Sequence, residues 1–92
     1  MYSLKPTAKY RKSIRKLAMS GRFRIGDLDK ILNLLASGKT LEPKYRSHPL
    51  NGEYAGCFEC HVKSDLLLIY EIDKSERELT IIDIGSHSDL FE

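Results

Sequence analysis

The 92-residue chain contains no tryptophan, only two cysteines and three prolines, and no long hydrophobic run. Its longest apolar stretch, residues 66–70, is far shorter than the roughly 20 residues that a membrane-spanning helix needs. The N-terminal sequence MYSLKPTAKY lacks the apolar core of a secretory signal, so we expect a cytoplasmic protein with no membrane contact. Two cysteines in an unexported chain are expected to be reduced thiols rather than a disulfide.

What is present is a globular composition, 41% hydrophobic and 30% charged, with a strongly uneven charge distribution. Residues 1–46 carry 12 Lys or Arg against 3 Asp or Glu, whereas residues 47–92 carry 3 against 10, so the two halves hold +9 and −7. A chain of this length is expected to form one domain, 1–92, with a modest core. A basic block typically meets phosphate or an acidic partner, and the alternative is a solvated helix face.

Hydrophobic periodicity predicts the element order β-α-α-β-β-β, which is an α+β fold. The alternating stretch 2–5 is typical of a first strand, and Pro6 ends it. Thr7 can cap a first amphipathic helix, and Asp27 can cap a second helix that ends at Gly38. We expect the two helices to form a hairpin that packs on a sheet.

The second half of the chain has the pattern of strands joined by tight turns. Residues 40–53 contain two prolines and an Asn-Gly pair and are expected to be irregular. Three strands are predicted after them, at 54–63, 65–72 and 78–84. Because short loops join these strands, they should be antiparallel. Residues 85–92 form a short tail.

The stretch from Cys57 to His61 reads C-F-E-C-H, the C-x-x-C-H spacing of a c-type haem attachment site. Side chains alternate along a strand, so Cys60 should face the core while Cys57 and His61 face the other, more polar side. Haem and zinc sites with this spacing need both sulfurs on one side. A zinc site built from Cys57, His61, His48 and His87 would lack the paired cysteine spacing of such sites. We therefore expect no metal and no cofactor.

The chain has three histidines, each in a distinctive position. His48 precedes Pro49 in the loop before the predicted strands. His61 lies on the polar face of a strand, and Asp65 follows it across a tight turn. His87 comes just after the last strand. Gathered at one site, three histidines and a carboxylate would suit proton transfer near neutral pH; the alternative is three unrelated polar residues.

Three ordered motifs follow the basic N-terminal region: HPLNGEYAG at 48–56, CHVKSDLLLIY at 60–70 and GSHSDLF at 85–91. Together they resemble the YafQ-type branch of the RelE-like bacterial toxins, and the resemblance extends over nearly the whole chain. It implies the RelE-like fold, a small twisted antiparallel sheet with an N-terminal helical hairpin. This agrees with the predicted element order.

The resemblance also implies a function and partners. Members of this family are toxins of type II toxin–antitoxin systems that enter the ribosomal A site and cut the messenger RNA there without a metal ion. The partners implied are the ribosome, mRNA and a cognate acidic antitoxin, which would bind operator DNA at its other end. The alternative is a ParE-type toxin, which binds and inhibits DNA gyrase and has no nucleolytic site.

Carried over motif by motif, the family's active-site positions fall on His48, His61, Asp65, His87 and Phe91. Cleavage by the ribose 2′-hydroxyl needs a base, an acid for the leaving 5′ oxygen and stabilisation of the phosphorane-like transition state. The assignment implied is His87 as acid, Asp65 or His61 as base, and His48 as the group that orients or stabilises the phosphate. Phe91 is expected either to stack on an RNA base or to anchor the tail to the core.

Asp83 departs from the family pattern. Many relatives carry an arginine at this position, two residues before Gly85, where it can meet the scissile phosphate. A carboxylate cannot replace a cation there. Either Arg46 or Lys63 is therefore expected to bind the substrate and supply the positive charge, or activity is reduced, or Asp83 has another task.

Overall fold

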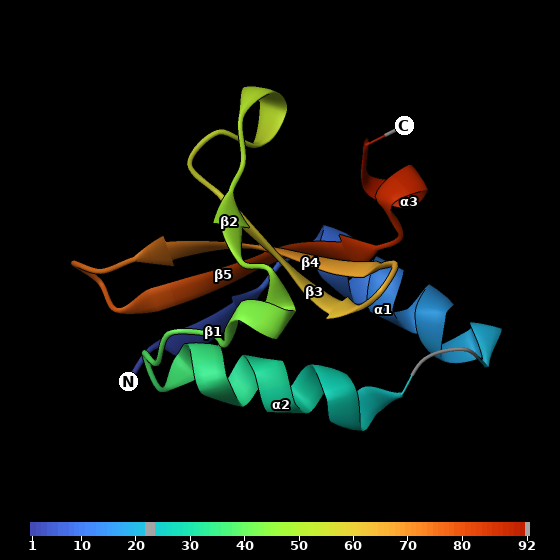
Figure 1. Cartoon of the computed structure of the whole chain (residues 1–92), viewed down its shortest axis with the longest axis horizontal. Helices are drawn as coiled ribbons and strands as arrows, with labels where there is room; N and C mark the ends of the chain where they lie inside the picture. The colour runs from blue at the N-terminus through green and yellow to red at the C-terminus, as the bar shows by residue number, and fades with distance from the viewer. Residues whose placement is uncertain (22–23, 92) are drawn as a thin grey trace.

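The computed structural model describes residues 1–21 and 24–91. Its strands, helices and short 3₁₀ helices follow one another in the order shown in Figure 1. In chain order they are β1 (Ser3–Pro6), α1 (Ala8–Ser20), α2 (Ile25–Ala36), η1 (Pro43–Tyr45), β2 (His48–Pro49), η2 (Gly52–Tyr54), β3 (Phe58–Lys63), β4 (Leu66–Asp73), β5 (Glu78–Gly85) and α3 (His87–Phe91).

The strands form one five-stranded sheet in the order β1-β5-β4-β3-β2. The pairs β2–β3, β3–β4 and β4–β5 are antiparallel, as the short loops predicted for the last three strands. The first strand instead runs parallel to β5, with Ser3 opposite Glu78. A parallel neighbour requires a long crossover, and both helices lie in the chain between these two strands. The α+β fold predicted from the sequence is confirmed.

Helices α1 and α2 cover one face of the sheet, and the main core lies between them and the strands (Figure 1). This cluster combines residues of both helices with the side chains of β3, β4 and β5 that face them. In β5 the alternation is interrupted by a bulge, so the inward positions pass from Leu79 and Ile81 to Ile84. Within the described residues, no helix is long and apolar enough to cross a lipid bilayer. The buried members of the core are Tyr10, Leu28, Ile31, Leu35, Leu41, Tyr45, Cys60, Leu66, Leu68, Tyr70, Leu79, Ile81 and Ile84.

A second, smaller cluster lies on the opposite face of the sheet. It contains Cys57, Leu67, Ile69 and Leu90, and the loop before β3 and helix α3 cover it. Figure 1 shows that this loop and α3 rise from the same side of the sheet. The prediction that Cys57 faces an open, polar side was therefore wrong in part, because two segments that seemed irregular in sequence fold over the middle of that face.

The helix boundaries test the capping predictions directly. The Oγ1 of Thr7 accepts a hydrogen bond from the backbone N–H of Tyr10 at 3.1 Å, and α1 ends before Gly21, whose φ of +74° suits a glycine. The predicted cap at Asp27 was wrong. The N-cap of α2 is Arg24, three residues earlier, and Asp27 lies in the first turn, where the helix dipole favours a carboxylate.

The three strands predicted for the second half of the chain are present, but their ends differ from the predicted ones. Strand β3 begins at Phe58 rather than at residue 54, because the preceding residues turn through η2 and Gly56, which has a φ of +93°. His48 and Pro49, predicted to be irregular, form a short strand on β3. The tail after Gly85 forms helix α3, which no hydrophobic period announced.

Candidate active site

Strand register aligns four chemically distinct side chains across the second face of the sheet. His48 pairs with Glu59, Glu59 pairs with Ile69, and Ile69 pairs with Asp83. Residues directly opposite one another in a sheet share a face. His48 at one edge and Asp83 on β5 therefore lie in one row, with Glu59 and Ile69 between them. The next residue of β3 on this face is His61, whose partner on β4 is Leu67.

Glu59 is the centre of the first polar group on this face. Its Oε1 lies 3.2 Å from Nε2 of His48 and 3.7 Å from Nε2 of His61. Its side chain is only 8% exposed, so this carboxylate is removed from water and depends on the two imidazoles for polar contacts. Sequence analysis gave Glu59 no role. Its alternation with His61 was visible, but the contact with His48 requires strand β2, which the sequence did not predict.

Two acceptor groups face the ring nitrogens of His48. Its Nδ1 lies 3.1 Å from the carbonyl oxygen of Pro49, and its Nε2 faces the carboxylate of Glu59. Both partners can only accept, whereas a neutral imidazole carries a single N–H. The two contacts fix the orientation of the ring, which is half exposed.

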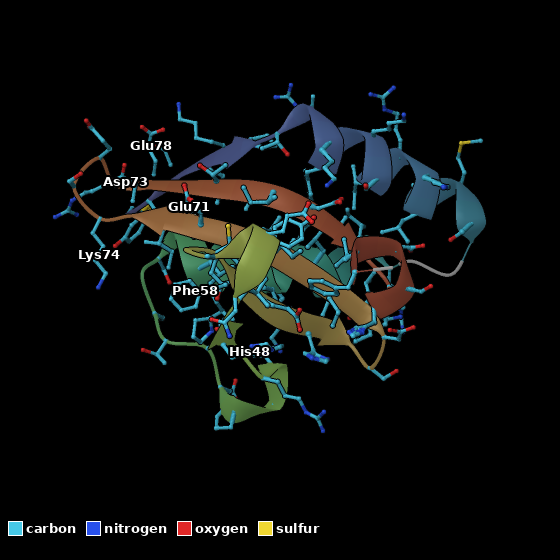
Figure 2. All side chains as sticks on the ribbon, turned by 90° about the horizontal axis from the view of Figure 1, so that it is seen from above. His48, Phe58, Glu71, Asp73, Lys74 and Glu78 are labelled. Carbon is cyan, nitrogen blue, oxygen red and sulfur yellow. The ribbon has the colours of Figure 1, made fainter. Side chains whose placement is uncertain are left out.

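Two contacts fix the loop that carries His48. The hydroxyl groups of Ser47 and Tyr70 lie 2.8 Å apart, and the N–H of Leu50 donates to the carbonyl oxygen of Cys57 at 2.9 Å. Burial raises the pKa of Tyr70, so its hydroxyl stays protonated. Figure 2 shows His48, in β2, well away from three labelled acidic residues. These are Glu71 and Asp73 of β4 and Glu78, the first residue of β5.

The second polar group surrounds His87, the first residue of α3. The Oγ of Ser86 accepts from the N–H of Asp89, and Oδ2 of Asp89 accepts from the N–H of Ser86, both at 3.0 Å. This reciprocal pair has the geometry of a capping box. A Cβ on Gly85 would meet the Cβ of Asp89 at 3.0 Å, so any other residue there would crowd the cap. The motif G-S-H-S-D therefore explains how His87 is held.

Asp65 is joined to His87 through the backbone. Its Oδ1 accepts a hydrogen bond from the N–H of His87 at 3.1 Å, which ties the β3–β4 turn to the start of α3. The interaction satisfies one of the free N–H groups at the start of the helix. Asp65 and His87, predicted to belong to one site, do lie together, and both are exposed.

Aromatic rings connect α3 to the loop before β3. The ring of His87 lies 5.0 Å from that of Phe91, and Phe91 meets Tyr54 edge to face at 5.9 Å. Phe91 is 38% exposed, so one part of its ring is fixed while another part is accessible. Both expectations for this residue, anchoring and stacking, are compatible with this position.

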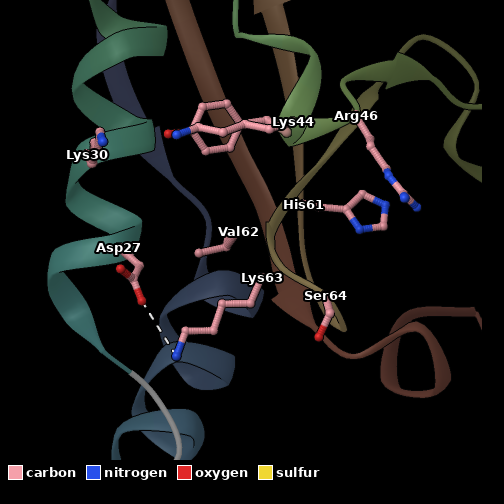
Figure 3. Close-up of a pocket in the computed structure, with 9 residues that line it drawn as sticks. Asp27, Lys30, Lys44, Arg46, His61, Val62, Lys63 and Ser64 are labelled. Carbon is pink, nitrogen blue, oxygen red and sulfur yellow. Dashed lines mark ion pairs between the residues drawn. The ribbon is translucent and has the colours of Figure 1, made fainter.

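A basic pocket of about 470 Å³ opens next to His61 (Figure 3). Figure 3 shows Arg46 and His61 on one side of it and Lys63 on the other, where Nζ of Lys63 lies 3.5 Å from Oδ2 of Asp27. Arg46 and Lys63, the two cations expected to bind substrate, thus line one pocket. Four Lys or Arg residues line it against one carboxylate: Lys30, Lys44, Arg46 and Lys63 against Asp27.

Asp83 does not reach this pocket and has a different environment. Its side chain is 6% exposed, Oδ1 accepts from the hydroxyl of Ser13 at 2.6 Å, and Oδ2 lies 3.7 Å from Nζ of Lys9. Sequence analysis did not single out Lys9, which was one of many basic residues of α1. No periodicity in the sequence distinguishes it, because its partners come from β5 and the loop before β3.

The two cysteines lie in different clusters on opposite faces of the sheet. Cys60 belongs to the main core and Cys57 to the smaller cluster, as the alternation predicted. Burial raises the pKa of both thiols, that of Cys60 to about 12. Both are free. Among residues 1–21 and 24–91, no group of three His, Cys, Asp or Glu side chains is arranged to hold a metal ion.

The predicted site residues therefore form two groups on one side of the sheet rather than a single cluster of side chains in direct contact. One group comprises His48 and His61, which meet at the carboxylate of the unpredicted Glu59, with the basic pocket beside it. The other comprises Asp65, His87 and Phe91.

The chain matches, over residues 2–92, the model of a family described as the bacterial toxin of type II toxin–antitoxin systems, YafQ. It is 30% identical over 86 residues to the mRNA interferase toxin YafQ of Escherichia coli strain K12, an alignment that covers 92% of this chain and 90% of that protein.

Solved structures agree with the family match. A metal-bound toxin from Helicobacter pylori is 40% identical, with a TM-score of 0.89 and coverage of 99% of this chain and 100% of that one. YafQ in the DinJ–YafQ complex of Escherichia coli is 26% identical, with a TM-score of 0.87 and full coverage of both chains. The likeness thus extends over the whole fold.

Proposed function

As a member of the YafQ family of toxins of bacterial type II toxin–antitoxin systems, this chain is an endoribonuclease, and we propose that it cleaves mRNA in the ribosomal A site. The observation that carries the proposal is the grouping of three histidines and Asp65 on one side of the sheet, beside a basic pocket. A toxin that acted by binding alone would have no need of this set.

The chemistry proposed is attack by the substrate's own ribose 2′-oxygen on the adjacent phosphorus. A base takes the 2′-hydroxyl proton as the new O–P bond forms, and an acid protonates the 5′ oxygen as its bond to phosphorus breaks. The products are a 2′,3′-cyclic phosphate and a 5′-hydroxyl end. Every proton in this sequence is supplied or taken by a side chain, so no metal-bound hydroxide is required.

Each side chain has a proposed role that its surroundings support. His87 is the general acid, because its ring is exposed and its backbone is fixed by α3 and Asp65. Asp65 or His61 is the base. His48 orients or stabilises the phosphate, since its two acceptor partners hold the half-exposed ring in place.

Substrate binding is proposed for the pocket beside His61 and for the accessible part of Phe91. Arg46 and Lys63 would contact backbone phosphates, which attract cations independently of base sequence. The exposed part of Phe91 would stack on a base, a contact worth roughly 1–3 kcal/mol.

A cognate antitoxin is proposed as the protein partner. A YafQ relative has been solved in complex with DinJ, and the first half of this chain, with its net charge of +9, suits an acidic segment. The other end of the antitoxin would bind operator DNA. Reversing the charge of Lys12 and Lys16 together should weaken the complex, which calorimetry at two salt concentrations would measure. Unchanged affinity of this double variant at low salt would show that helix α1 does not contribute to the antitoxin interface.

Primer extension on a reporter mRNA after brief induction tests the enzymatic proposal. New 5′-hydroxyl ends within translated codons, lost when the start codon is removed, are the expected result. An intact message together with DNA damage signals would overturn the proposal and favour a gyrase-binding toxin. Ends carrying a 5′ phosphate would overturn the 2′-hydroxyl mechanism, because they require water or hydroxide as the nucleophile.

A further inference from the structure

Lys9, in the first turn of α1, is held in a defined position although its side chain is 60% exposed. Its ammonium donates to the hydroxyl of Tyr54 at 3.2 Å and lies 3.7 Å from Oδ2 of Asp83. The same nitrogen lies 5.7 Å from the centre of the Tyr54 ring. Three contacts from two other parts of the chain thus fix a surface ammonium that would otherwise sample many rotamers.

Asp83 is fixed independently of Lys9. Its Oδ1 accepts from the hydroxyl of Ser13 at 2.6 Å and from the backbone N–H of Ile84 at 2.8 Å. These donors leave Oδ2 directed at Lys9. A buried carboxylate with two other hydrogen bonds is a rigid anchor for a cation. Asp83 therefore holds the Lys9 ammonium in a fixed position, unlike the partners of an ion pair between two mobile surface side chains.

The Lys9 ammonium belongs to the side of the sheet that carries His87. A pocket of about 380 Å³ is lined by Lys9, Tyr54 and Phe91, together with Asn51, Glu53 and Leu90. Phe91 is in ring contact with His87 at 5.0 Å. The cation and the proposed acid are therefore separated by a short run of packed aromatic side chains.

Lys9 retains the capacity to bind an anion. An ammonium has three N–H donors; Tyr54 accepts from one, and the carboxylate of Asp83, 3.7 Å away, faces a second as an ion pair without a hydrogen bond. The hydrogen bond to Tyr54, with Asp83 contributing, raises the pKa of Lys9, so the group stays charged throughout the physiological range. The remaining donor is available at the exposed side of the ammonium.

We propose that Lys9, held by Asp83 and Tyr54, binds a phosphodiester of the substrate RNA on the side of the sheet that carries His87. This inference rests on the proposed RNA-cleaving function and adds a substrate contact to it. It also gives Asp83 a role. A carboxylate repels phosphate, but Asp83 can support RNA binding indirectly by holding the Lys9 ammonium in position. The competing explanation is that Lys9 only neutralises a buried Asp83.

The test compares Lys9→Gln, Asp83→Asn and the double variant, with Lys5→Gln as matched control. Lys5 is 58% exposed and lies 4.0 Å from Glu78, so it resembles Lys9 in exposure and pairing but lies on β1. Binding is measured by anisotropy of a labelled single-stranded RNA with 2′-O-methyl riboses, which cannot be cleaved. Cleavage is measured in single turnovers on ribosomes programmed with an unmodified codon.

Lys9→Gln should weaken RNA binding by about 10-fold or more, because a charge-assisted hydrogen bond to phosphate is lost. The slope of log affinity against log salt should fall by about 0.7, the value for one phosphate contact on a single strand. The double variant should bind as weakly as Lys9→Gln. Lys5→Gln should retain wild-type binding and cleavage.

Recovery of wild-type binding in the double variant would show that Lys9 only neutralises Asp83, and the proposal would fail. An unchanged salt slope in Lys9→Gln, or equal effects of Lys9→Gln and Lys5→Gln, would also overturn it. These outcomes concern binding. If wild-type protein binds the RNA through Lys9 but cuts no codon on the ribosome, the enzymatic proposal fails while the phosphate contact stands.

Discussion

The carboxylate of Asp65 accepts a hydrogen bond from the backbone N–H of His87 at 3.1 Å, so one proposed catalytic residue holds another in place. Twenty-two residues separate them in the chain. The contact closes the β3–β4 turn against helix α3. Asp65 therefore has a structural role, whether or not its carboxylate also acts as the catalytic base. Substitutions can separate the structural role from the catalytic one.

Asp65→Asn and Asp65→Ala should have different effects. Asparagine retains an oxygen that can accept from the N–H of His87 but cannot act as a base, whereas alanine loses both functions. If Asp65 is the base, both variants lose about 10²-fold or more in the single-turnover cleavage rate. Near wild-type activity in Asp65→Asn, with a loss in Asp65→Ala, would assign the base to His61 and leave Asp65 a positioning role.

His87→Gln should abolish codon-dependent cleavage and growth arrest. Glutamine has a similar length but cannot donate a proton at neutral pH, and general acid help is typically worth about 10²–10⁴-fold in rate. The ring is exposed and the hydrogen bond from this residue to Asp65 comes from the backbone, so folding should be preserved. The cleavage rate tests the loss of activity, and circular dichroism and antitoxin binding test whether the variant is folded. A folded His87→Gln variant with full toxicity would contradict the assignment.

The sequence predicted most of the fold because the core pattern is strong and local. The apolar positions of α1 and α2 follow the helical period, the last three strands are rich in apolar residues, and Thr7 and Gly21 mark the ends of α1. Two bulges interrupt the strand pairing, and no local pattern revealed them. Asp27 was misplaced because an acidic residue is favourable both as a cap and inside the first helical turn. Two residues form β2 only because β3 offers an edge, which no local pattern reveals.

The site was harder to predict because its contacts are not local. Glu59 meets His48 across a strand pair, and Lys9 meets Asp83 across 74 positions of the chain. Family resemblance located the histidines, Asp65 and Phe91, which remain proposals as catalytic or binding residues. It could not locate Lys9, because the departure at Asp83 acquires meaning only when the fold brings α1 beside β5.

The two thiols should react slowly in the folded protein. Burial raises the pKa of Cys60 to about 12, against about 8.5 for a free thiol, so little thiolate forms at pH 8. A disulfide reagent should label both cysteines rapidly in urea and slowly without it. Cys57→Ala isolates Cys60, and rapid labelling of that variant when folded would contradict its burial.

The raised pKa of Cys60 also makes the stability of the fold depend on pH. Between about pH 8.5 and 12 the unfolded Cys60 thiol ionises while the folded one does not, so this group favours unfolding increasingly as pH rises. The urea midpoint of wild type should therefore fall more steeply with pH over this range than that of Cys60→Ala. Parallel curves for the two proteins would show that Cys60 ionises equally easily in both states.

Glu59→Gln should impair cleavage without unfolding the protein. The amide oxygen can still accept from one histidine, but the negative charge beside both imidazoles is lost. We expect the single-turnover rate to fall by roughly 10-fold, since hydrogen bonds to charged groups contribute about 1.5–3 kcal/mol. Glu71→Gln, at an exposed position of β4, is the control and should keep wild-type activity.

A double-mutant cycle determines whether Glu59 acts through His48. Contacting residues in one hydrogen-bond network show interaction energies of about 0.5–3 kcal/mol, whereas independent residues add within about 0.5 kcal/mol. The loss caused by Glu59→Gln should therefore shrink when His48 is already alanine. The same cycle with His61→Ala should show weaker coupling, because His61 lies 3.7 Å from the carboxylate and His48 lies 3.2 Å from it. Additive losses in both cycles would mean that Glu59 supports the fold of β3 and does not position the imidazoles.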